Sequence, residues 1–590
     1  MMTQIISSMK NASREGKVRG LFRLFQRHVM HVRCLRDIRA MERRHAEADR
    51  AYDSWFRKGR CDENQKRQQG DRSFSHTLSY LIPTYNTRPE LLRALADSLL
   101  AQTCDAWEAC FYDGASSRED TIRVLKQLTN EDERFHVLFG RENLGISGNT
   151  NKALMMAGGD VLALCDHDDL LTEDCTYWLL DAAERGADFI YSDEDKVNEE
   201  GTIFYDPHLK ADFSPDALRS GNYICHVMAM SAELMRRLGG LRSVCDGSQD
   251  HDLALRATEQ ARAIAHIPRI LYHWRMLNTS FSHASQERCA LAATRAVRDQ
   301  LERLELGGTC EMVNVAPQVR YSLPEHTSIS LIVHDLDGGL DVRWLRRLLK
   351  KTVEEKERIC EILVAGHSGI TAFNGISVRA YDHVQAAAEN ATGNLLLLVE
   401  QGTMPVWSNW LERLSMFATR PWIGMSGGGL VDARQNYLAC GYAVHVPGGA
   451  IGRFHGENRF GITYQLYDRS PRECTAVSSA LLMIRTSLFL ALGGFELYQT
   501  DLGAVALGLR AQQKGLSSIV VPEAVAQASR TTILRDPFSQ KDLLRFGEEF
   551  PAPCEHAYSV HFERQIGSMT VDFDRHEQPV TVLTKYDHAE

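Results

Sequence analysis

A run of apolar residues ends in a cluster of carboxylates at residues 161–169, which read VLALCDHDD. A short apolar run that stops at polar residues is typical of a buried strand. Similar runs occupy residues 77–82 (TLSYLI) and 107–112 (WEACFY), and leucines at helical spacing over residues 91–99 separate them. This alternation of strands and helices predicts an α/β domain with a mostly parallel sheet flanked by helices.

Carboxylates follow the predicted strands and precede a later helix: Asp113, the cluster at 166–169, and residues 248–252 (SQDHD). In open parallel sheets, ligands bind beyond the carboxyl ends of the strands. Mg²⁺ and Mn²⁺ prefer carboxylate oxygens together with substrate phosphates. Asp166 and Asp168 therefore favour a Mg or Mn site, with a solvated Asp pair at a helix start as the alternative.

Composition narrows the class of protein. The chain has 590 residues, 44% of them hydrophobic and 24% charged, as expected for a globular protein of several domains. A net charge of −10 argues against a protein built to coat nucleic acid. The sequence has neither an apolar run of ~18 residues nor a secretory signal, so we expect a cytoplasmic protein without a membrane span.

The first 50 residues differ in charge from the rest, with twelve Lys and Arg against five Asp and Glu. Apolar residues at 21, 24 and 25 share one face of a predicted helix, and arginines recur every four residues from Arg19. Such a helix can lie on the inner face of an anionic cell membrane. The alternative is an ordinary helix that packs on the next domain and leaves its arginines in solvent.

Residues 78–285 resemble family 2 glycosyltransferases of the GT-A fold. The motifs that carry the resemblance occur in the family's order: 82–86 (IPTYN), 112–116 (YDGAS), 143–151 (NLGISGNTN), 166–169 (DHDD), 249–253 (QDHDL) and 271–275 (LYHWR). Residues 191–196 (YSDEDK) and 222–226 (NYICH) look most like rhamnosyltransferase-type members that assemble polysaccharides. Gln249 stands where Glu is common in the family, and Gly114 where many members have a further Asp.

The resemblance implies a role for each matching residue. Asp250 would be the base that deprotonates an acceptor hydroxyl in an inverting displacement. The nucleotide-sugar would be bound by Pro83, Tyr85, Asp113, Asn151, Asp166, His273 and Arg275, and the metal by Asp168, Asp166 and His273.

Simpler interpretations of four of these positions remain open. Asp250 precedes a helical pattern and could cap it. His273 could be a packed core histidine, and Arg275 could form a surface ion pair. Asp195 and Lys196 could lie in a solvated loop or belong to an acceptor or donor site.

A second, diverged copy of the domain follows the first. The matches pair Glu361 with Glu108, residues 391–399 with 157–165, residues 481–494 with 227–240, and Arg510 with Arg256. The copy is similar to a second GT-A domain. The predicted fold is therefore α/β, with two tandem GT-A-like, Rossmann-like domains of mostly parallel sheets flanked by helices and an N-terminal helical extension.

The second copy lacks the working residues. Gly366 replaces Asp113, residues 400–403 (EQGT) replace DHDD, Ala504 replaces Asp250, and residues 527–529 (QAS) replace the motif at 273–275. We therefore predict a pseudo-enzyme domain in which Gly402 and Ala504 tolerate substitution without loss of turnover. The alternatives are an active site that uses Glu400 and Asp501, or an error in the alignment.

The predicted organisation is a basic helical extension (1–58), a linker (59–76), a catalytic domain (77–320), a degenerate domain (327–535) and a C-terminal tail that packs on the second domain (536–590). The first functional hypothesis is a metal-dependent, inverting glycosyltransferase of polysaccharide biosynthesis. Its partners would be a nucleotide-diphosphate sugar and a glycan or lipid-linked acceptor. The alternative is a glycan-binding or scaffolding subunit of an assembly complex. A nucleotidyltransferase or hydrolase is disfavoured because no Gly-rich phosphate loop with Lys occurs.

Overall fold

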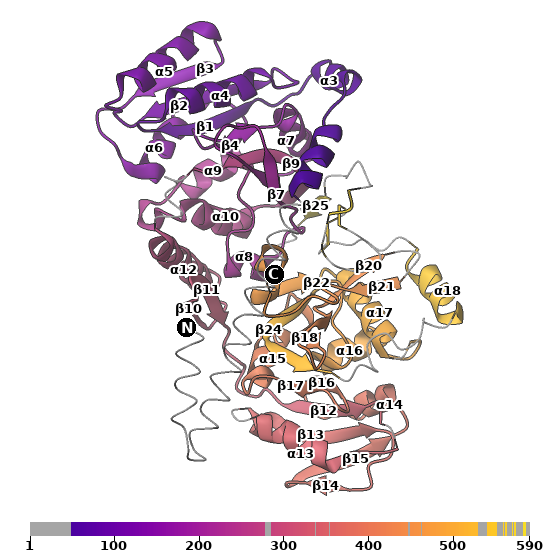
Figure 1. Ribbon diagram of the computed structural model, residues 1–590. Helices are drawn as coiled ribbons and strands as arrows, with labels where there is room; N and C mark the ends of the chain where they lie inside the picture. Colours follow the sequence, from indigo (N-terminus) through magenta and orange to yellow (C-terminus); the bar gives the residue numbers. More distant parts are fainter. Residues whose placement is uncertain are drawn as a thin grey trace, which may run out of the picture.

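The computed structural model describes residues 49–585 apart from 278–284, 337, 353–354, 446–448, 462, 499, 529–539, 552–557, 560, 563–568, 570 and 574–581. Two α/β domains lie one above the other in Figure 1. Helix α12 (Gln286–Arg303) and the hairpin of β10 (Thr309–Val313) and β11 (Ala316–Arg320) lead from the first to the second. The predicted tandem α/β architecture is confirmed, whereas the basic helix predicted before residue 49 lies outside the described residues.

The first domain is built on one sheet with the strand order β25-β9-β6-β8-β4-β1-β2-β3. Its strands are β1 (Leu78–Thr84), β2 (Trp107–Asp113), β3 (Phe135–Phe139), β4 (Val161–Leu164), β6 (Phe189–Val197), β8 (Met228–Ser231), β9 (Ala263–Arg275) and β25 (Val582–Lys585). The main helices are α4 (Pro89–Leu100), α5 (Glu119–Glu131), α6 (Gly145–Leu154), α7 (Cys175–Glu184), α8 (Pro215–Ser220), α9 (Ala232–Leu238) and α10 (Gln249–Gln260). Short strands β5 (Leu170–Leu171) and β7 (Phe204–His208) pair with β9 and β6.

The burial of strand β1 explains why its sequence is largely apolar. Leu81 packs into one hydrophobic cluster, while Leu78, Tyr80 and Ile82 pack into another, so both faces of the sheet are covered. The strand continues through Pro83 to Thr84, two residues beyond the apolar run at 77–82. Neighbouring β4 pairs with β1 only as far as Leu81, so on that side Pro83 has no paired strand that its missing N–H would disrupt.

The second domain repeats this sheet. The order β24-β18-β23-β16-β12-β13-β15 corresponds, strand by strand, to β9-β6-β8-β4-β1-β2-β3. The strands are β12 (Ile329–His334), β13 (Ile359–Ala365), β15 (Ile376–Tyr381), β16 (Leu395–Glu400), β17 (Met404–Pro405), β18 (Ile423–Val431), β23 (Leu481–Arg485) and β24 (Ser517–Gln527). The helices include α13 (Val342–Lys351), α14 (Val384–Glu389), α15 (Trp410–Ala418), α16 (Thr486–Ala491) and α17 (Thr500–Gln512).

Matching hydrogen bonds establish the register between the two copies. The Ser79 hydroxyl donates to Glu108 Oε1 over 2.6 Å, and the Ser330 hydroxyl donates to Glu361 Oε1 over the same distance. In each copy a glycine N–H before the strand that corresponds to β4 donates to the serine, over 2.9 Å. The sequence alignment is therefore correct at these positions.

A second matched pair consists of an arginine in α10 and an arginine in α17. Arg256 Nη1 donates to the Leu238 carbonyl over 2.9 Å, and Arg510 Nη1 donates to the Leu492 carbonyl over 3.0 Å. Both arginines close the end of the preceding helix, so they serve the fold in both copies.

The segment before the first domain is more ordered than a linker. Residues 49–58 are helical, and Tyr52, Trp55 and Phe56 pack against the first domain. The predicted linker contains α3 (Glu63–Gly70), which starts with a capping box between Asp62 and Gln65.

The C-terminal tail contacts both domains. Helix α18 (Gln540–Glu549) packs on the second domain, where Glu549 accepts from the Tyr498 hydroxyl over 2.9 Å. Strand β25 instead joins the first sheet and pairs antiparallel with residues Ala263–His266 of β9. The sequence predicted a tail that packs on the second domain alone. The backbone groups of β9 at the edge of the first sheet can pair with any extended segment, and the sequence of the tail does not reveal this pairing. Within the described residues, no helix combines the length and apolar composition that crossing a bilayer requires.

Candidate active site

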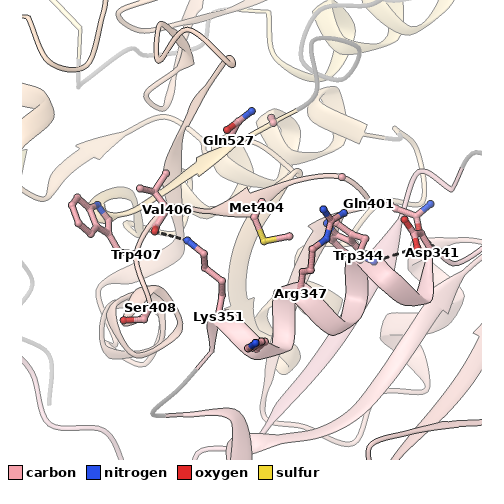
Figure 2. Close-up of a pocket in the computed structure, with 13 residues that line it drawn as sticks. Asp341, Trp344, Arg347, Lys351, Gln401, Met404, Val406, Trp407, Ser408 and Gln527 are labelled. Atoms are coloured by element: carbon pink, nitrogen blue, oxygen red, sulfur yellow. Dashed lines mark hydrogen bonds between the residues drawn. The ribbon is translucent and has the colours of Figure 1, made fainter. Parts of the chain in front are cut away.

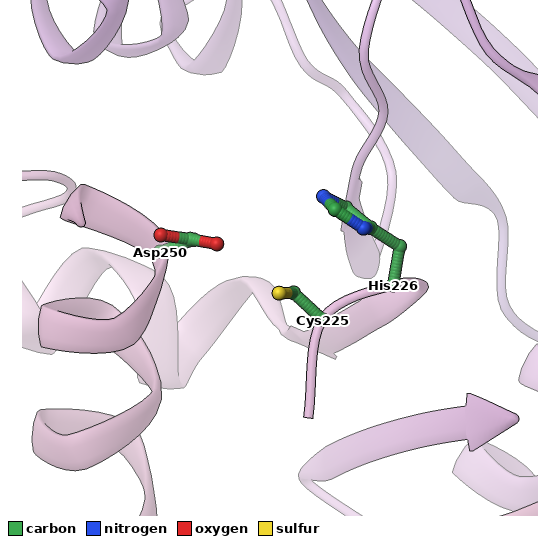
Figure 3. Close-up of side chains that lie close together, drawn as sticks. All are labelled: Cys225, His226 and Asp250. Carbon is green, nitrogen blue, oxygen red and sulfur yellow. The ribbon is translucent and has the colours of Figure 1, made fainter. Parts of the chain in front are cut away.

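Asp250 lies beside Cys225 and His226, which precede β8 (Figure 3). One ligand atom from each of the three lies within 4.8 Å of the others, and no further trio of His, Cys or carboxylate groups this close occurs in the described parts of the chain. Asn222 Nδ2 donates to Asp250 Oδ2 over 2.9 Å. Ser248 is the N-cap of α10, so the capping interpretation of Asp250 is wrong.

The acidic loop after β4 separates into exposed and buried carboxylates. The side chains of Asp166 and Asp168 are 41% and 25% exposed, whereas Asp169 is almost fully buried. Asp169 accepts from the Tyr272 hydroxyl and from the Arg275 N–H, both over 2.7 Å, and thereby ties the loop to β9. Partial burial raises the pKa of Asp166, and the charge of Asp168 adds to this against the opposing charge of a histidine.

That histidine, His226, lies between the acidic loop after β4 and strand β6. Its Nε2 lies 3.8 Å from Asp166 Oδ2, and its ring stacks on Tyr272 with centroids 4.9 Å apart. On the other side, its Nδ1 lies 3.2 Å from Glu194 Oε2. Burial lowers the pKa of His226, but the hydrogen bond to Glu194 and the charges of Glu194 and Asp166 outweigh this and raise it to about 9.

A buried lysine, Lys210, connects β6 to the segment that carries His226. Lys210 Nζ donates to the carbonyls of Ser192, Ile224 and His226 over 2.7–2.8 Å. Burial raises the pKa of Glu194, but the charge of Lys210 and hydrogen bonds from histidines lower it well below its usual value. Residues 191–196 belong to strand β6, and Glu194 of this segment contacts His226. Asp195 and Lys196 thus lie in a strand, which excludes the solvated-loop interpretation.

The structure does not bring His273 together with Asp166 and Asp168. His273 Nδ1 lies 2.5 Å from Asp195 Oδ1, and its ring contacts Phe56 and Phe204 with centroids 5.1 and 4.4 Å away. Its neighbours in β9, Tyr272 and Trp274, are the residues that contact His226. Side chains alternate between the two faces of a strand, so His273 points to the opposite face. This placement favours the packed-histidine interpretation, and a role in metal binding stays a prediction.

Arg275 lies next to the acidic loop but is not on the surface. Its Nε donates to the Asp168 carbonyl over 2.6 Å, and its Nη1 donates to the Glu199 carbonyl over 2.7 Å. The Nη2 atom is buried without a hydrogen-bond partner. Because the residue is 2% exposed and binds carbonyls, the surface ion-pair interpretation is wrong.

The predicted nucleotide contacts near β1 and β2 are Asp113, Pro83 and Tyr85. Asp113 ends β2 opposite Thr84 and accepts hydrogen bonds from the Ser116 N–H and hydroxyl, over 2.9 and 2.5 Å. Pro83 is in β1, and Tyr85 follows the strand with 46% of its surface exposed. Their roles toward a nucleotide remain predictions.

Asn151 and Gly114 have clear structural roles. The Asn151 amide donates to the Leu241 carbonyl and accepts from the Leu241 N–H, both over 2.9 Å. Both of its functional groups are thus engaged, and a nucleotide contact stays a prediction. A Cβ at Gly114 would lie 2.5 Å from Asn149 Nδ2, so a larger residue here would require the Asn149 side chain to move.

In the second domain, the alternative base is buried and strongly hydrogen-bonded. Asp501 accepts from the hydroxyls of Tyr442 and Ser478, over 2.7 and 2.8 Å, and from the Ser479 N–H over 2.8 Å. Ala504, at the position of Asp250, is fully buried. Gly402, at the position of Asp168, has φ of +102°, a conformation that strains any other residue.

Sequence reasoning missed the roles of His226, Glu194 and Lys210. The motifs 191–196 and 222–226 point to a subgroup of the family, and within them the sequence singles out Asp195 and Lys196 rather than Glu194 and His226. The available signal was the run of three carboxylates at 193–195 shortly after the apolar residues 189–191, because charged residues are rarely buried in a strand unless they are paired.

Comparisons with known proteins agree with the family resemblance of the first domain. Glycosyl transferase family 2 matches residues 79–238. The chain is 29% identical over 503 residues to the uncharacterized protein y4gI of Sinorhizobium fredii, a match that covers 79% of this chain and 54% of that protein. It is 28% identical over 465 residues to the O-antigen biosynthesis protein RfbC of Myxococcus xanthus, covering 74% of this chain and 36% of RfbC.

A third relative matches a shorter part. The putative teichuronic acid biosynthesis glycosyltransferase TuaG of Bacillus subtilis is 32% identical over 126 residues, which cover 21% of this chain and 49% of TuaG. The chain thus spans about half of y4gI and about a third of RfbC. The family match lies within the domain that carries the acidic loop and the loop at 222–226, so the first domain of this chain is similar to glycosyltransferase family 2.

Proposed function

We propose that the chain is an inverting, metal-dependent glycosyltransferase of polysaccharide biosynthesis, such as that of an O-antigen, capsule or exopolysaccharide. It would move a sugar from a nucleotide-diphosphate sugar to a glycan or lipid-linked glycan acceptor. The observation that carries the proposal is the placement of His226 within 3.8 Å of Asp166 and within the same cluster as Asp250. The names of RfbC and TuaG support polysaccharide biosynthesis.

The residues present fit a divalent cation. Asp166 and Asp168 are both partly exposed, and their nearest charged contacts are histidines rather than Lys or Arg. Beside them, Arg275 keeps one buried N–H group without a partner. When bound by Asp166 and Asp168, a Mg²⁺ or Mn²⁺ ion would neutralise charge on the donor's diphosphate.

The protein's own groups account for the proton and the charge. Asp250 accepts the proton of the acceptor hydroxyl, whose oxygen forms the new bond to the anomeric carbon. The bond from that carbon to the diphosphate breaks, and the nucleoside diphosphate leaves with the electron pair. His226 is cationic at neutral pH because its pKa is about 9, and it adds positive charge beside Asp166.

The substitution Asp250→Asn tests this assignment. It keeps the shape and the hydrogen-bonding position of the side chain but removes the base, so we expect sugar transfer to fall about 10²–10⁴-fold. Binding of UDP, GDP and dTDP, screened with Mn²⁺ by thermal shift, should stay unchanged for whichever nucleotide stabilises the wild type.

Glu259→Gln is the matched control, because Glu259 lies at the other end of α10 and pairs with Arg303 over 2.6 Å. It should retain transfer. Full transfer by Asp250→Asn would show that another group is the base, and loss of nucleotide binding in this variant would assign Asp250 to donor binding instead.

A further inference from the structure

A large cavity lies in the second domain, between α13 and the loop that contains β17 (Figure 2). Its volume is about 1010 Å³. Residues Arg347, Lys350 and Lys351 line it from the helix, and Met404 and Trp407 line it from the loop. In Figure 2, Trp407 marks one end of the cavity and Asp341 the other. The loop corresponds to the acidic loop of the first domain, but it carries no carboxylate on the cavity.

The helix that forms one wall is strongly basic. Five of the ten residues of α13 are Arg or Lys and none is acidic, in a chain whose net charge is −10. The corresponding helix of the first domain, α4, carries both signs of charge. Arg347 and Lys350 are exposed and form no ion pair within the described part of the chain. The acidic residue on the lining, Asp341, accepts from the N–H groups of Arg343 and Trp344 as the helix cap.

The opposite wall is fixed to this helix. Lys351 Nζ donates to the Val406 carbonyl over 2.7 Å, and the buried Trp344 donates through Nε1 to the Thr403 carbonyl over 3.0 Å. The neighbouring Trp407 leaves 51% of its surface exposed. An exposed indole beside a row of cations can cover the apolar face of a sugar ring while the cations pair with acidic groups on the same chain.

The cavity lacks the groups that serve a nucleotide diphosphate through a metal. Gly402 lines it where the first domain has Asp168. Any anion here must therefore be held by the cationic side chains directly. A concave wall with an aromatic rim suits a polymer strand better than a flat lipid surface.

We propose that this cavity binds an acidic glycan segment, a sugar chain that carries carboxylate or phosphate groups. The inference rests on the proposed function and extends it, because the second domain would hold the growing anionic polymer while the first domain adds to an acceptor. The two domains of the pseudo-symmetric pair would then divide acceptor-strand binding and catalysis between them.

Binding of a galacturonate oligosaccharide to the full chain tests the proposal, with a malto-oligosaccharide of equal length as the neutral probe. The double variant Arg347→Ala/Lys350→Ala should weaken galacturonate binding about tenfold or more, since a charge-assisted hydrogen bond contributes about that factor. Trp407→Ala should weaken it as well. Arg343→Ala is the matched control, because its side chain is 93% exposed on the same helix and does not line the cavity.

Three results would overturn the proposal: no galacturonate binding by the wild type, equal weakening by Arg343→Ala, or binding only to vesicles of anionic phospholipid. Nucleotide binding with Mn²⁺ is measured on the same samples and reports on the first domain. If it persists while galacturonate fails to bind, the inference fails and the proposed function stands. Trp407→Ala alone keeps the test decisive should the double variant fail to fold, because Trp407 is a surface residue.

Discussion

Three consecutive carboxylates of β6 each contact a histidine, and His266 and His273 are buried while His226 is partly buried. Asp193 lies 3.0 Å from His266, Glu194 lies 3.2 Å from His226, and Asp195 lies 2.5 Å from His273. Isolated charges are costly to bury, and such pairs persist because each charge is compensated by its partner. The pair of Glu194 and His226 serves the candidate site, while the other two stabilise the packing around β9.

The pair of Asp193 and His266 gives a prediction about pH. Burial lowers the pKa of His266, but hydrogen bonds with Asp193 and Asp212 raise it to about 9. A raised pKa contributes stability that is complete below the unfolded value of about 6.5 and disappears as the pH rises through about 9. His266 should therefore contribute up to ~3 kcal/mol to the free energy of unfolding at pH 6.5, and this contribution should vanish by pH 10.

Urea unfolding of Asp212→Asn at both pH values measures this contribution. The variant should be less stable than the wild type at pH 6.5, and the difference should shrink at pH 10. Asp97→Asn is the control, since Asp97 pairs with Arg93 on the surface and its side chain is 63% exposed. A deficit that is the same at both pH values would show that His266 is not charged in the folded protein.

At the scale of elements, β25 covers an edge of the first sheet. It adds residues Val582–Lys585 to β9, on the side away from β6. An uncovered edge strand presents unpaired N–H and C=O groups that promote association between molecules. The tail thus connects the second domain to the first, because α18 contacts the second and β25 the first.

Truncation of the tail should expose this edge. A chain that ends at residue 578 should melt a few °C lower and aggregate more readily, which differential scanning fluorimetry and light scattering measure. A chain that ends at residue 585 keeps β25 and should match the wild type. Equal behaviour of the two truncations would mean that β25 contributes nothing to the stability of the sheet.

At the scale of the whole molecule, two copies of one fold have kept the same framework and diverged at the site. The bonds of Ser79 and Ser330 are the same, and so are those of Arg256 and Arg510. The candidate catalytic groups occur only in the first copy, since Ala504 replaces Asp250. The second copy contacts the first through Tyr467, whose hydroxyl lies 2.7 Å from His208 Nε2, and His208 in turn contacts Glu194.

This asymmetry predicts different effects of equivalent substitutions. Asp168→Ala should remove the Mn²⁺-dependent part of nucleotide binding in a thermal-shift titration. Gly402→Ala should leave it intact but lower the melting temperature, because φ of +102° costs an alanine about 1 kcal/mol or more. The structure thus refines the expectation that Gly402 tolerates substitution: turnover should survive, while stability should not. Loss of nucleotide binding in Gly402→Ala would contradict the pseudo-enzyme assignment.

The sequence by itself determined the two α/β domains, the repeat and the loops that carry carboxylates. Apolar runs such as 161–165 specify buried strands, and parallel strands place their carboxyl ends at one edge, so Asp113 and Asp166 could be assigned to the same region, whereas the family resemblance placed Asp250 there. Tertiary structure alone decided which side chains meet. His226 reaches Glu194 and Asp166 across three segments, His273 faces the opposite side of β9, and β25 returns to the first sheet. Contacts of this kind depend on register and on distant chain segments, which local patterns of residues do not encode.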